Sequence, residues 1–293
     1  MAGPLPLCYL NGEYAALRDA RISPLDRGFL FGDSVYEVLP VFDRRMFLFA
    51  EHFDRLAHSL REIRLENPHT HAEWRAILEE LIARNGASDL YIYVQVTRGT
   101  EYGRNHAFPA VVKPTVFAMA SPLPVFNDAQ RAAGLSAITL EDFRWGRCDI
   151  KATALLANVL MKQQAADAGA NEAIILRDGE VMEGSSTSVF IVSGGTLVTP
   201  PNSHRILPGT TRDAALSLAQ PVMPVKIRSI SIEELRAADE VWISAATRDV
   251  LPVTLVDGAP IGTGKPGPAW LRLADAFKEL RQRLAGTPPY TAR

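Results

Sequence analysis

Short runs of alternating apolar and polar residues dominate the first 120 residues, a period-2 pattern typical of half-buried β-strands. The Asn11-Gly12 pair between two such runs predicts a tight hairpin. Apolar residues from Phe53 to Ile63 instead recur every three or four positions, which predicts a helix. The other elements predicted here are strands over 35–42, 46–49, 90–97 and 115–119, and a helix over 74–84.

Beyond this region, predicted strands alternate with helices. Residues 154–168 are rich in Ala and Leu and are followed by Gly169, which is typical of a helix end. A helix starts at Thr210, a short one covers 231–236, and the amphipathic pattern over 270–284 predicts a terminal surface helix. The predicted strands are 135–140, 173–176, 181–182, 189–192, 196–199, 222–227 and 241–244.

A chain of 293 residues corresponds to about two domains. The pattern predicts an α+β fold with an N-terminal α+β domain over 1–120 and a C-terminal α+β domain over 132–293. A linker over 121–131, which begins with Ser121-Pro122-Leu123-Pro124, is expected to join them.

The composition is that of an ordinary globular protein, with 47% hydrophobic and 22% charged residues and a formal net charge of −2. No broad basic surface indicates nucleic acid, and no apolar run has the length of a membrane span. The N-terminus lacks the features of a secretion signal. Two cysteines are too few for a disulfide framework and lack metal-site spacing. We therefore expect a cytoplasmic protein with no metal site.

Lys151 stands apart from the other five lysines because it lies at an element junction, just before the predicted helix over 154–168. A lysine amine that is partly removed from water is a nucleophile suited to Schiff-base formation. A surface lysine near a helix start is the alternative interpretation.

Two further segments could bind an anion or a polar ring. The run Leu207-Pro208-Gly209-Thr210-Thr211 offers backbone N–H groups and hydroxyls at a helix start, which favours phosphate, although simple capping would use the same residues. Glu183 is followed by small hydroxyl residues, Ser185 and Ser186, which could meet a polar ligand or only form a turn.

Cationic side chains occur in two more places. Arg104 and His106 lie in a loop after a predicted strand, where they could converge on a carboxylate. Arg55 lies three residues after His52 on a predicted helix and could bind phosphate, or pair with Asp54 or Glu51 at the surface.

Taken together, these segments resemble fold-type IV pyridoxal-phosphate aminotransferases, and most closely the D-amino acid aminotransferase branch. The similarity covers nearly the whole chain, and six blocks follow the order of that family. The matching blocks are Asp26–Glu37, Glu51–Leu56, Gln95–Gly99, Arg144–Lys151, Glu183–Ser186 and Gly209–Asp213.

The resemblance implies a two-domain α+β fold with pyridoxal 5'-phosphate in a cleft between the domains. Lys151 would be the catalytic residue, forming the Schiff base with the cofactor and moving the proton at the substrate α-carbon. Glu183 would pair with the pyridine nitrogen. The other cofactor-binding residues implied are Arg55, Ser185, Ser186, Leu207, Thr210, Thr211, Ala246 and Thr247.

The resemblance also implies a substrate site and an assembly. Tyr36, Val38, Arg104 and His106 would bind the substrate, with Tyr36, Arg104 and His106 on its α-carboxylate. In the D-amino acid branch the Arg-x-His loop comes from the neighbouring subunit, which implies a homodimer. The substrates would be an amino acid such as D-alanine or D-glutamate and a 2-oxo acid such as pyruvate or 2-oxoglutarate.

Two positions depart from the family pattern. Ser188 stands where Asn is frequent, and Ala246 stands in a phosphate turn that in relatives is richer in hydroxyls, so that Ala246 can contribute only its backbone. The alternative functions are a branched-chain L-amino acid aminotransferase, an aminodeoxychorismate-lyase-like enzyme, an (R)-amine transaminase and a non-catalytic binding module. The Arg104–His106 pair and the Ser-Ser after Gly184 argue against the branched-chain branch.

Overall fold

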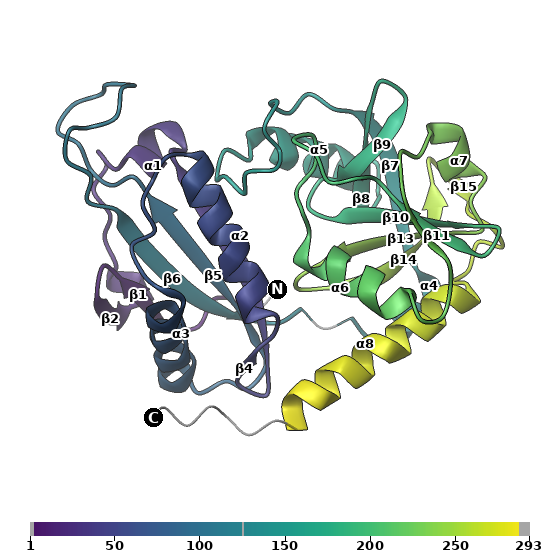
Figure 1. Ribbon diagram of the computed structural model, residues 1–293, viewed down its shortest axis with the longest axis horizontal. Coiled ribbons are helices and arrows are strands. Elements are labelled where there is room, and N and C mark those ends of the chain that lie inside the picture. Colours follow the sequence, from purple (N-terminus) through teal and green to yellow (C-terminus); the bar gives the residue numbers. More distant parts are fainter. Residues whose placement is uncertain (1–2, 125, 287–293) are drawn as a thin grey trace. The chain divides into compact units, whose positions relative to one another are not determined.

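The chain divides into two compact units in the computed structural model, which describes residues 3–124 and 126–286. The first unit contains the chain up to Pro124 and also Ile150–Ala154, and the second contains the segment that ends at Asp149 and Leu155–Arg283. The predicted two-part α+β fold is confirmed (Figure 1). Residues 1, 2, 125 and 287–293 of the predicted domains and linker lie outside the described residues.

One segment differs from the predicted domain division. Residues 150–154, with Lys151, belong to the first unit and not to the predicted C-terminal domain. The reason is local pairing, because Val35 and Ala152 form an antiparallel bridge and Ile150 packs into the hydrophobic core of the first unit. The boundaries predicted at 120 and 131 remain predictions.

The first unit is built on an antiparallel sheet of six strands in the order β2-β1-β6-β5-β3-β4. The Asn11-Gly12 hairpin joins β1 and β2 as predicted, with positive φ at both turn residues. The strands are β1 (Leu7–Leu10), β2 (Glu13–Ala16), β3 (Ser34–Phe42), β4 (Arg45–Met46), β5 (Leu90–Thr97) and β6 (Thr115–Pro122). The helices are η1 (Leu17–Asp19), α1 (Arg27–Phe31), α2 (Phe49–Glu62) and α3 (His71–Asn85).

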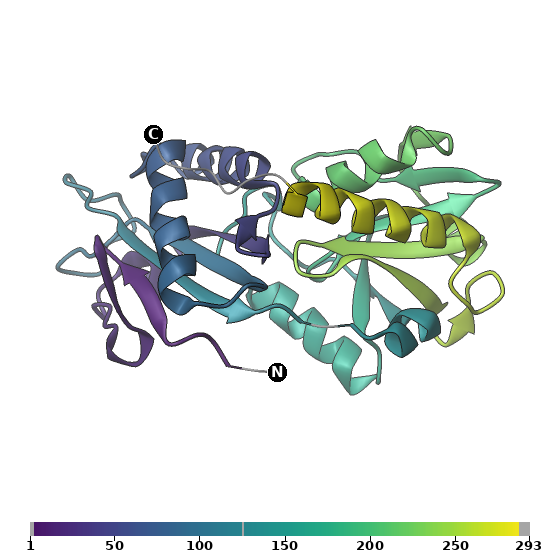
Figure 2. The same cartoon turned by 90° about the horizontal axis from the view of Figure 1, so that it is seen from below.

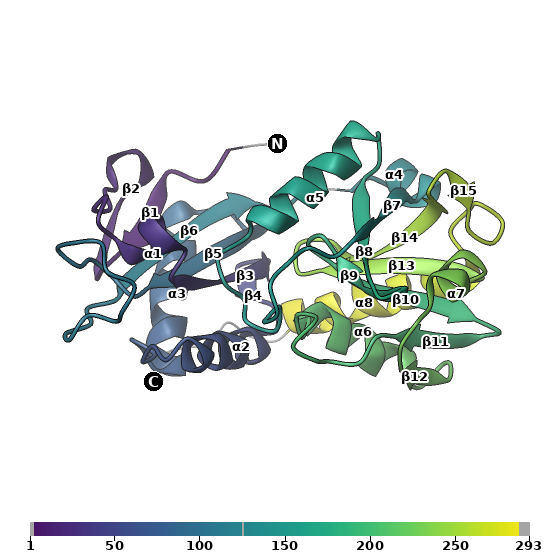
Figure 3. The ribbon, with the colours of Figure 1, turned by 90° about the horizontal axis from the view of Figure 1, so that it is seen from above.

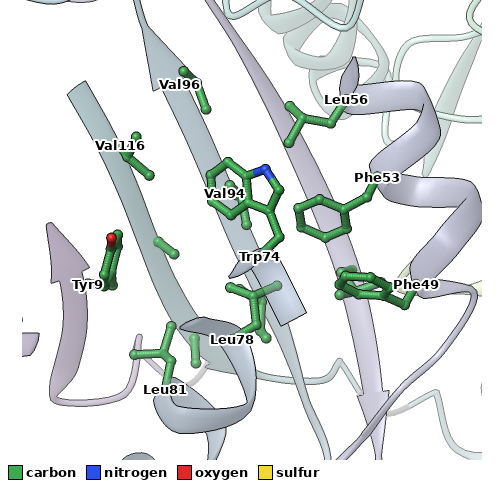
Figure 4. Close-up of a cluster of buried hydrophobic side chains, with 14 of the residues drawn as sticks. Tyr9, Phe49, Phe53, Leu56, Trp74, Leu78, Leu81, Val94, Val96 and Val116 are labelled. Carbon is green, nitrogen blue, oxygen red and sulfur yellow. The ribbon is translucent and has the colours of Figure 1, made fainter. Parts of the chain in front are cut away.

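Helices α2 and α3 cover one face of this sheet, as Figure 3 shows. Their apolar stripes bury Phe53 and Trp74, whose ring centres lie 5.4 Å apart, against Val94 and its neighbours on β5 (Figure 4). The strand predicted over 46–49 is therefore too long. Only Arg45–Met46 pair with β3, and Phe49 begins α2 because its ring stacks on Phe53 in the core.

The second unit is built on a mixed sheet of nine strands, with β12-β11-β10-β13-β14-β7-β8-β9 in order and β15 paired with β14. Strand β14 was absent from the predicted elements, although it lies between β13 and β7. The strands are β7 (Leu135–Glu141), β8 (Glu172–Arg177), β9 (Glu180–Gly184), β10 (Ser188–Ser193), β11 (Thr196–Thr199), β12 (Val225–Ile227), β13 (Glu240–Ala245), β14 (Asp249–Val256) and β15 (Ala259–Pro260).

The helices of the second unit lie on both sides of its strands, with α5 on one side and α8 on the other (Figure 2). None of the described helices is long and apolar enough to cross a membrane. The helices are α4 (Asp128–Ala133), α5 (Leu156–Asp167), α6 (Thr210–Ala219), α7 (Ile232–Arg236) and α8 (Pro268–Gly286).

Helix α8 is the amphipathic helix that its pattern predicts. Trp270, Leu273 and Phe277 form its buried face. Its first N–H groups are satisfied by a strand residue, because the buried carboxylate of Glu240 accepts from Ala269 N and Trp270 N at 2.9 Å each. Glu240 therefore caps a helix that is distant in sequence.

We predict that Glu240→Ala lowers the free energy of unfolding by about 2 kcal/mol, because two buried N–H groups lose their acceptor. The matched control is Glu279→Ala, which replaces an exposed glutamate on the same helix and should change the free energy by less than about 0.5 kcal/mol. Urea unfolding of both variants measures the difference. Equal, small effects would show that Glu240 does not hold α8.

Candidate active site

The backbone of Lys151 is fixed by two elements of the first unit. Its carbonyl accepts the N–H of Tyr36 at 3.0 Å, and its own N–H donates to Ser59 Oγ on α2 at 3.2 Å. Its Nζ lies 4.3 Å from the centre of the Tyr36 ring. The half-buried amine is thus held against an aromatic face, at a junction where the sequence predicts a nucleophile.

Strand β3 presents Tyr36 and Val38, both half-buried, on the face opposite to Glu37, because side chains alternate along a strand. Tyr36 stacks on Tyr93 of β5 with ring centres 5.6 Å apart, and Tyr93 donates to Gln95 Oε1 at 2.9 Å. Burial, with the neighbouring Tyr36, raises the pKa of Tyr93 to about 12, so its hydroxyl stays protonated. The structure thus places Lys151 beside a polar aromatic patch that includes both predicted substrate residues of β3.

The opposite face of β3 carries Glu37, a fully buried carboxylate to which the sequence analysis gives no role. Glu37 accepts from Arg55 Nε at 2.7 Å and from Arg55 Nη2 at 2.8 Å. It also lies 2.8 Å from His52 Nδ1. His52, Arg55 and Ser59 share one face of α2, because they are three and four residues apart. Arg55 is therefore buried and paired with Glu37, and does not lie at the surface as one interpretation proposed.

Burial and pairing set the charges of this cluster. Burial alone would raise the pKa of Glu37, but the charge and hydrogen bonds of Arg55, with His52, outweigh it and hold the pKa well below its usual range. Burial lowers the pKa of His52, and the charge of Lys151 adds to this effect. Neutral His52 can then donate its Nδ1 proton to Glu37. The cluster thus contains an ionised Glu37, a charged Arg55 and a neutral histidine.

The segment from Arg98 to Pro114 joins β5 to β6 and carries Arg104 and His106. Both side chains are exposed, and Phe31 of α1 contacts both, with 5.2 Å between its ring centre and that of His106 and 5.1 Å to Arg104 Cζ. Within the described chain, no carboxylate lies within 4.0 Å of Arg104. The two predicted carboxylate-binding residues are thus brought together on one loop, with the Arg104 charge open to an anion.

In the second unit, Glu183 on β9 is buried and held from two sides. Arg144 Nη1 donates to Oε1, and Leu207 N donates to Oε2 at 3.1 Å. Arg144 is in turn held by Asp142, which accepts at 3.0 and 2.9 Å and also accepts from Arg177 Nη2 at 2.7 Å. Two carboxylates and two guanidinium groups thus form a compact network of compensated charge.

Burial raises the pKa of Glu183, against the opposing effects of Arg144 and the Leu207 N–H. Burial also disfavours the charge on Arg144, but its hydrogen bond to Asp142 and the attraction of Glu183 prevail and raise its pKa. The guanidinium of Arg144 therefore stays charged, and burial makes ionisation of the neighbouring Glu183 carboxylate costly. Such a carboxylate can pair with a positively charged N–H group of a ligand.

Ser185 and Ser186 follow Glu183, but their hydroxyls meet a different carboxylate. Glu172 of β8 is fully buried and accepts from Ser185 Oγ, from Ser186 Oγ at 3.5 Å and from Thr187 Oγ1 at 3.4 Å. Asn158 Nδ2 donates to the Ser185 carbonyl at 2.8 Å. These contacts fix the turn after Glu183, and a direct role for the two serines toward a cofactor remains a prediction.

Helix α6 begins at Thr210 as predicted, with Gly209 as its N-cap. Gly209 provides no side-chain cap, and a Cβ there would lie 2.6 Å from Ser188 Oγ. Ser188 pairs with Ser244 of β13, whose buried Oγ has no hydrogen-bond partner among the described residues. Helix N–H groups, the positive end of the helix dipole and an unsatisfied hydroxyl are features of an anion site.

Ala246 and Thr247 lie in the turn between β13 and β14, where Arg248 N donates to the Ala245 carbonyl at 3.0 Å. At position 246, where relatives more often have a hydroxyl residue, alanine contributes its backbone to the turn. The side chain of Thr247 contributes a hydroxyl. Leu207 remains on the segment before α6, half-buried beside Glu183. No group of His, Cys, Asp and Glu in residues 3–124 and 126–286 has the arrangement of a metal site.

The residues that hold the predicted site residues were not themselves predicted. They are Glu37, Arg144 and Glu172. A glutamate in an otherwise apolar strand, such as Glu37 in Ser34–Phe42 or Glu172 at the start of β8, was the available signal. A buried acid of this kind needs a buried base or donor.

We predict that Glu37→Gln lowers the free energy of unfolding at pH 7 by about 3 kcal/mol, because it leaves Arg55 buried without its counter-charge. The folded-state pKa of Glu37 is lowered, so its contribution is complete above the unfolded value of about 4.3 and is lost as the pH falls further. The difference in the free energy of unfolding between wild type and variant should therefore become smaller below that pH. Unfolding curves recorded across the acid range measure it.

The control for this series is Glu66→Gln, which changes an exposed glutamate of the same unit. Its free energy of unfolding should differ from that of the wild type by the same amount at every pH. A Glu37→Gln difference that stays constant with pH would contradict the assigned ionised state.

Comparisons with known proteins agree with this chemistry. The family model described as Amino-transferase class IV matches residues 34–256. The chain is 38% identical over 274 residues to the D-alanine aminotransferase of Staphylococcus haemolyticus, covering 92% of this chain and 96% of the relative. It is 39% identical over 280 residues to that of Listeria monocytogenes serotype 1/2a (strain 10403S), covering 94% of this chain and 96% of the relative.

Solved structures give the same result for the fold. The branched-chain aminotransferase from the archaeon Thermoproteus uzoniensis, solved with norvaline, superimposes with a TM-score of 0.85 at 26% identity, over 97% of each chain. The branched-chain amino acid aminotransferase from Escherichia coli also gives 0.85, at 28% identity and over 94% of each chain. The family match extends over most of both compact units, and the chain therefore belongs to the class IV aminotransferases.

Proposed function

We propose that this chain is a pyridoxal-phosphate-dependent transaminase that moves amino groups between D-amino acids and 2-oxo acids in a ping-pong reaction. D-Alanine and D-glutamate are the proposed donors, and pyruvate or 2-oxoglutarate the acceptor. The single observation that carries the proposal is the Lys151 amine, which is fixed at its backbone and held 4.3 Å from the Tyr36 ring centre. The D-alanine aminotransferases that match at 38–39% identity over most of the chain support the substrate class.

The residues present fit pyridoxal phosphate. The cofactor needs an amine for its aldehyde, a carboxylate for its ring nitrogen and donors for its phosphate. Lys151 supplies the first and Glu183 the second. The start of α6 supplies the third with its backbone N–H groups, and Ser244 Oγ lacks a partner among the described residues. The proposal assigns these groups of both units to one cofactor.

When bound, the cofactor supplies an aldehyde that carries the amino group and a ring that accepts electrons from the substrate α-carbon. Lys151 Nζ would hold the cofactor through its aldehyde group and would move the proton at the substrate α-carbon. Glu183, supported by Arg144, would pair with the ring nitrogen. Thr210, Thr211, Thr247 and Arg55 are the proposed phosphate donors, with Glu37 fixing the direction of the Arg55 guanidinium.

Arg104, His106 and Tyr36 are the proposed anchors of the substrate α-carboxylate. Anchors at both ends of a substrate select which bond breaks by orientation. In D-amino acid aminotransferases, which this chain resembles, the loop serves the neighbouring subunit, so the proposal includes a homodimer. The branched-chain L-amino acid aminotransferase is the second candidate, because the two branched-chain enzymes superimpose with TM-scores of 0.85. The exposed Arg104–His106 pair favours the first candidate.

We predict that Lys151→Ala abolishes production of pyruvate from D-alanine and 2-oxoglutarate, with a fall of at least about 1,000-fold, because both the nucleophile and the proton carrier are lost. The matched control is Lys278→Ala, which removes an exposed lysine on α8 and should leave the rate unchanged. A Lys151→Ala enzyme with the activity of the control would overturn the assignment.

We predict that Arg104→Ala raises the KM for D-alanine by about tenfold or more, because a charge-assisted hydrogen bond to the carboxylate is lost. The affinity of the apoenzyme for pyridoxal phosphate, measured by spectrophotometric titration, should change by less than about twofold. The exposed Arg18→Ala serves as the control. Equal losses of substrate and cofactor affinity would mean that the loop has another role.

A further inference from the structure

The segment Asp26–Asp33 is the first part of the matching block Asp26–Glu37, yet the proposed function assigns none of the residues in this segment a role. It contains α1 and lies beside the loop of residues 98–114 that carries Arg104 and His106 (Figures 1 and 3). We propose that Arg27 is the positioning residue of this loop, supported by Phe31, and that it sets the carboxylate-binding geometry of Arg104 and His106. The inference rests on the proposed function for the role of the loop.

The loop needs an external support. It is longer than the ordinary connection between strands, and such loops are commonly functional. It contains only isolated β-bridges, and the side chains from Tyr102 to Phe108 are all exposed. Exposed side chains bury little surface, so hydrogen bonds to the loop backbone are an important support for residues 104–107.

Arg27 makes these backbone contacts. Its Nη1 donates to the carbonyl of Asn105 at 2.6 Å and of Ala107 at 3.2 Å, and its Nη2 donates to the carbonyl of His106 at 3.1 Å. Nη1 also lies 3.0 Å from Glu101 Oε2. The rigid fork of one buried guanidinium thus binds three consecutive carbonyls around His106.

The Arg27 guanidinium is itself held in place by Asp33 and Phe31. Its Nε donates to Asp33 Oδ2 at 2.9 Å, at the end of the same block. The ring of Phe31, one helical turn after Arg27, lies 4.9 Å from Arg27 Cζ and contacts both His106 and Arg104 on the loop. Arg27 and Phe31 therefore act together on the backbone and the side chains of the predicted carboxylate site.

The two ends of the loop are tied to the residue before Arg27. Asp26 Oδ2 accepts from Thr97 Oγ1 at 2.9 Å and from Thr115 Oγ1 at 2.7 Å, and these threonines are paired across β5 and β6. Arg27 N donates to the Gly99 carbonyl at 2.8 Å. Asp26 thus holds the two ends of the loop, and the Arg27 side chain holds residues 105–107. A change of the Arg27 side chain alone should therefore loosen residues 105–107 and leave the ends of the loop in place.

Arg98 offers a matched control. It is also buried and pairs with Asp33, through Nε at 2.8 Å and Nη2 at 3.0 Å. Its other donors bind the carbonyls of Ile63 and Arg64 after α2. Its Cζ lies 3.7 Å from the centre of the Phe108 ring, but it donates no hydrogen bond to the carbonyls of residues 105–107. Arg98→Lys and Arg27→Lys therefore both weaken the contact with Asp33, and only Arg27→Lys releases residues 105–107.

The test is steady-state kinetics of the cofactor-loaded wild type, Arg27→Lys and Arg98→Lys with D-alanine. A lysine ammonium cannot reach three carbonyls and Asp33 together, so Arg27→Lys should raise the KM about tenfold with kcat changed by less than about threefold. Its affinity for pyridoxal phosphate should stay within about twofold of wild type. Arg98→Lys should keep the wild-type KM.

Amide hydrogen exchange gives a readout that does not depend on the reaction. Within residues 104–107, the N–H of Ala107 donates to Asn105 Oδ1 at 3.2 Å. This amide should exchange faster in Arg27→Lys than in the wild type and Arg98→Lys, while β5 and β6 keep their protection. If Arg27→Lys does not fold, Phe31→Leu replaces it and should also raise the KM and the exchange of the Ala107 N–H.

The outcomes separate the two proposals. A wild type that does not react with D-alanine contradicts the proposed function, and the exchange of the Ala107 N–H then still decides whether Arg27 holds the loop. A reactive wild type with an unchanged KM and unchanged exchange in Arg27→Lys, or with the same rise in KM in both lysine variants, overturns the inference about Arg27.

Discussion

The backbone hydrogen bonds that tie the segment Ile150–Ala154 to β3 and α2 determine where the reactive amine lies. Tyr36 N donates to the Lys151 carbonyl, Lys151 N donates to Ser59, and Ala152 forms a bridge with Val35. These contacts fix the main chain and leave the side chain of Lys151 as the part that can move. An amine that serves as nucleophile and then as proton carrier needs this combination, because it must reach more than one atom from one anchor.

Each unit contains a cluster of buried charged groups in which opposite charges are paired. Glu37 neutralises Arg55 in the first unit, and Asp142 and Glu183 neutralise Arg144 and Arg177 in the second. A buried charge without a partner is costly, so each cluster is stable only when complete. The exposed Arg104 lies outside such clusters, and its charge remains available for a ligand. The structure thus distinguishes cations that shape the site from one that can bind.

Local signals in the sequence predicted the elements that depend on local chemistry. The Asn11-Gly12 hairpin, the strand Leu90–Thr97 and the helix start at Thr210 are all present. Strand β14 escaped prediction because Pro252 lies within it, and proline argues against a central strand. The short α1 was also missed, since five residues give no helical period.

The partners of the site residues were not predictable, because they are distant in sequence. Glu37 lies eighteen positions before Arg55 on another element, and Glu183 follows Arg144 by 39. The family resemblance predicted which residues react, and the three-dimensional structure shows which residues contact them. The contacts of Glu37 and Arg27 were not predictable from the sequence.

The most direct test of the account is the half-reaction of the cofactor-loaded protein with a single amino donor and no 2-oxo acid. D-Alanine and L-leucine are added separately, and the visible absorbance of the bound cofactor is followed. The account predicts that D-alanine alone removes this absorbance as the amino group is transferred to the cofactor. Loss of absorbance with L-leucine alone would contradict it and would assign the chain to the branched-chain aminotransferases.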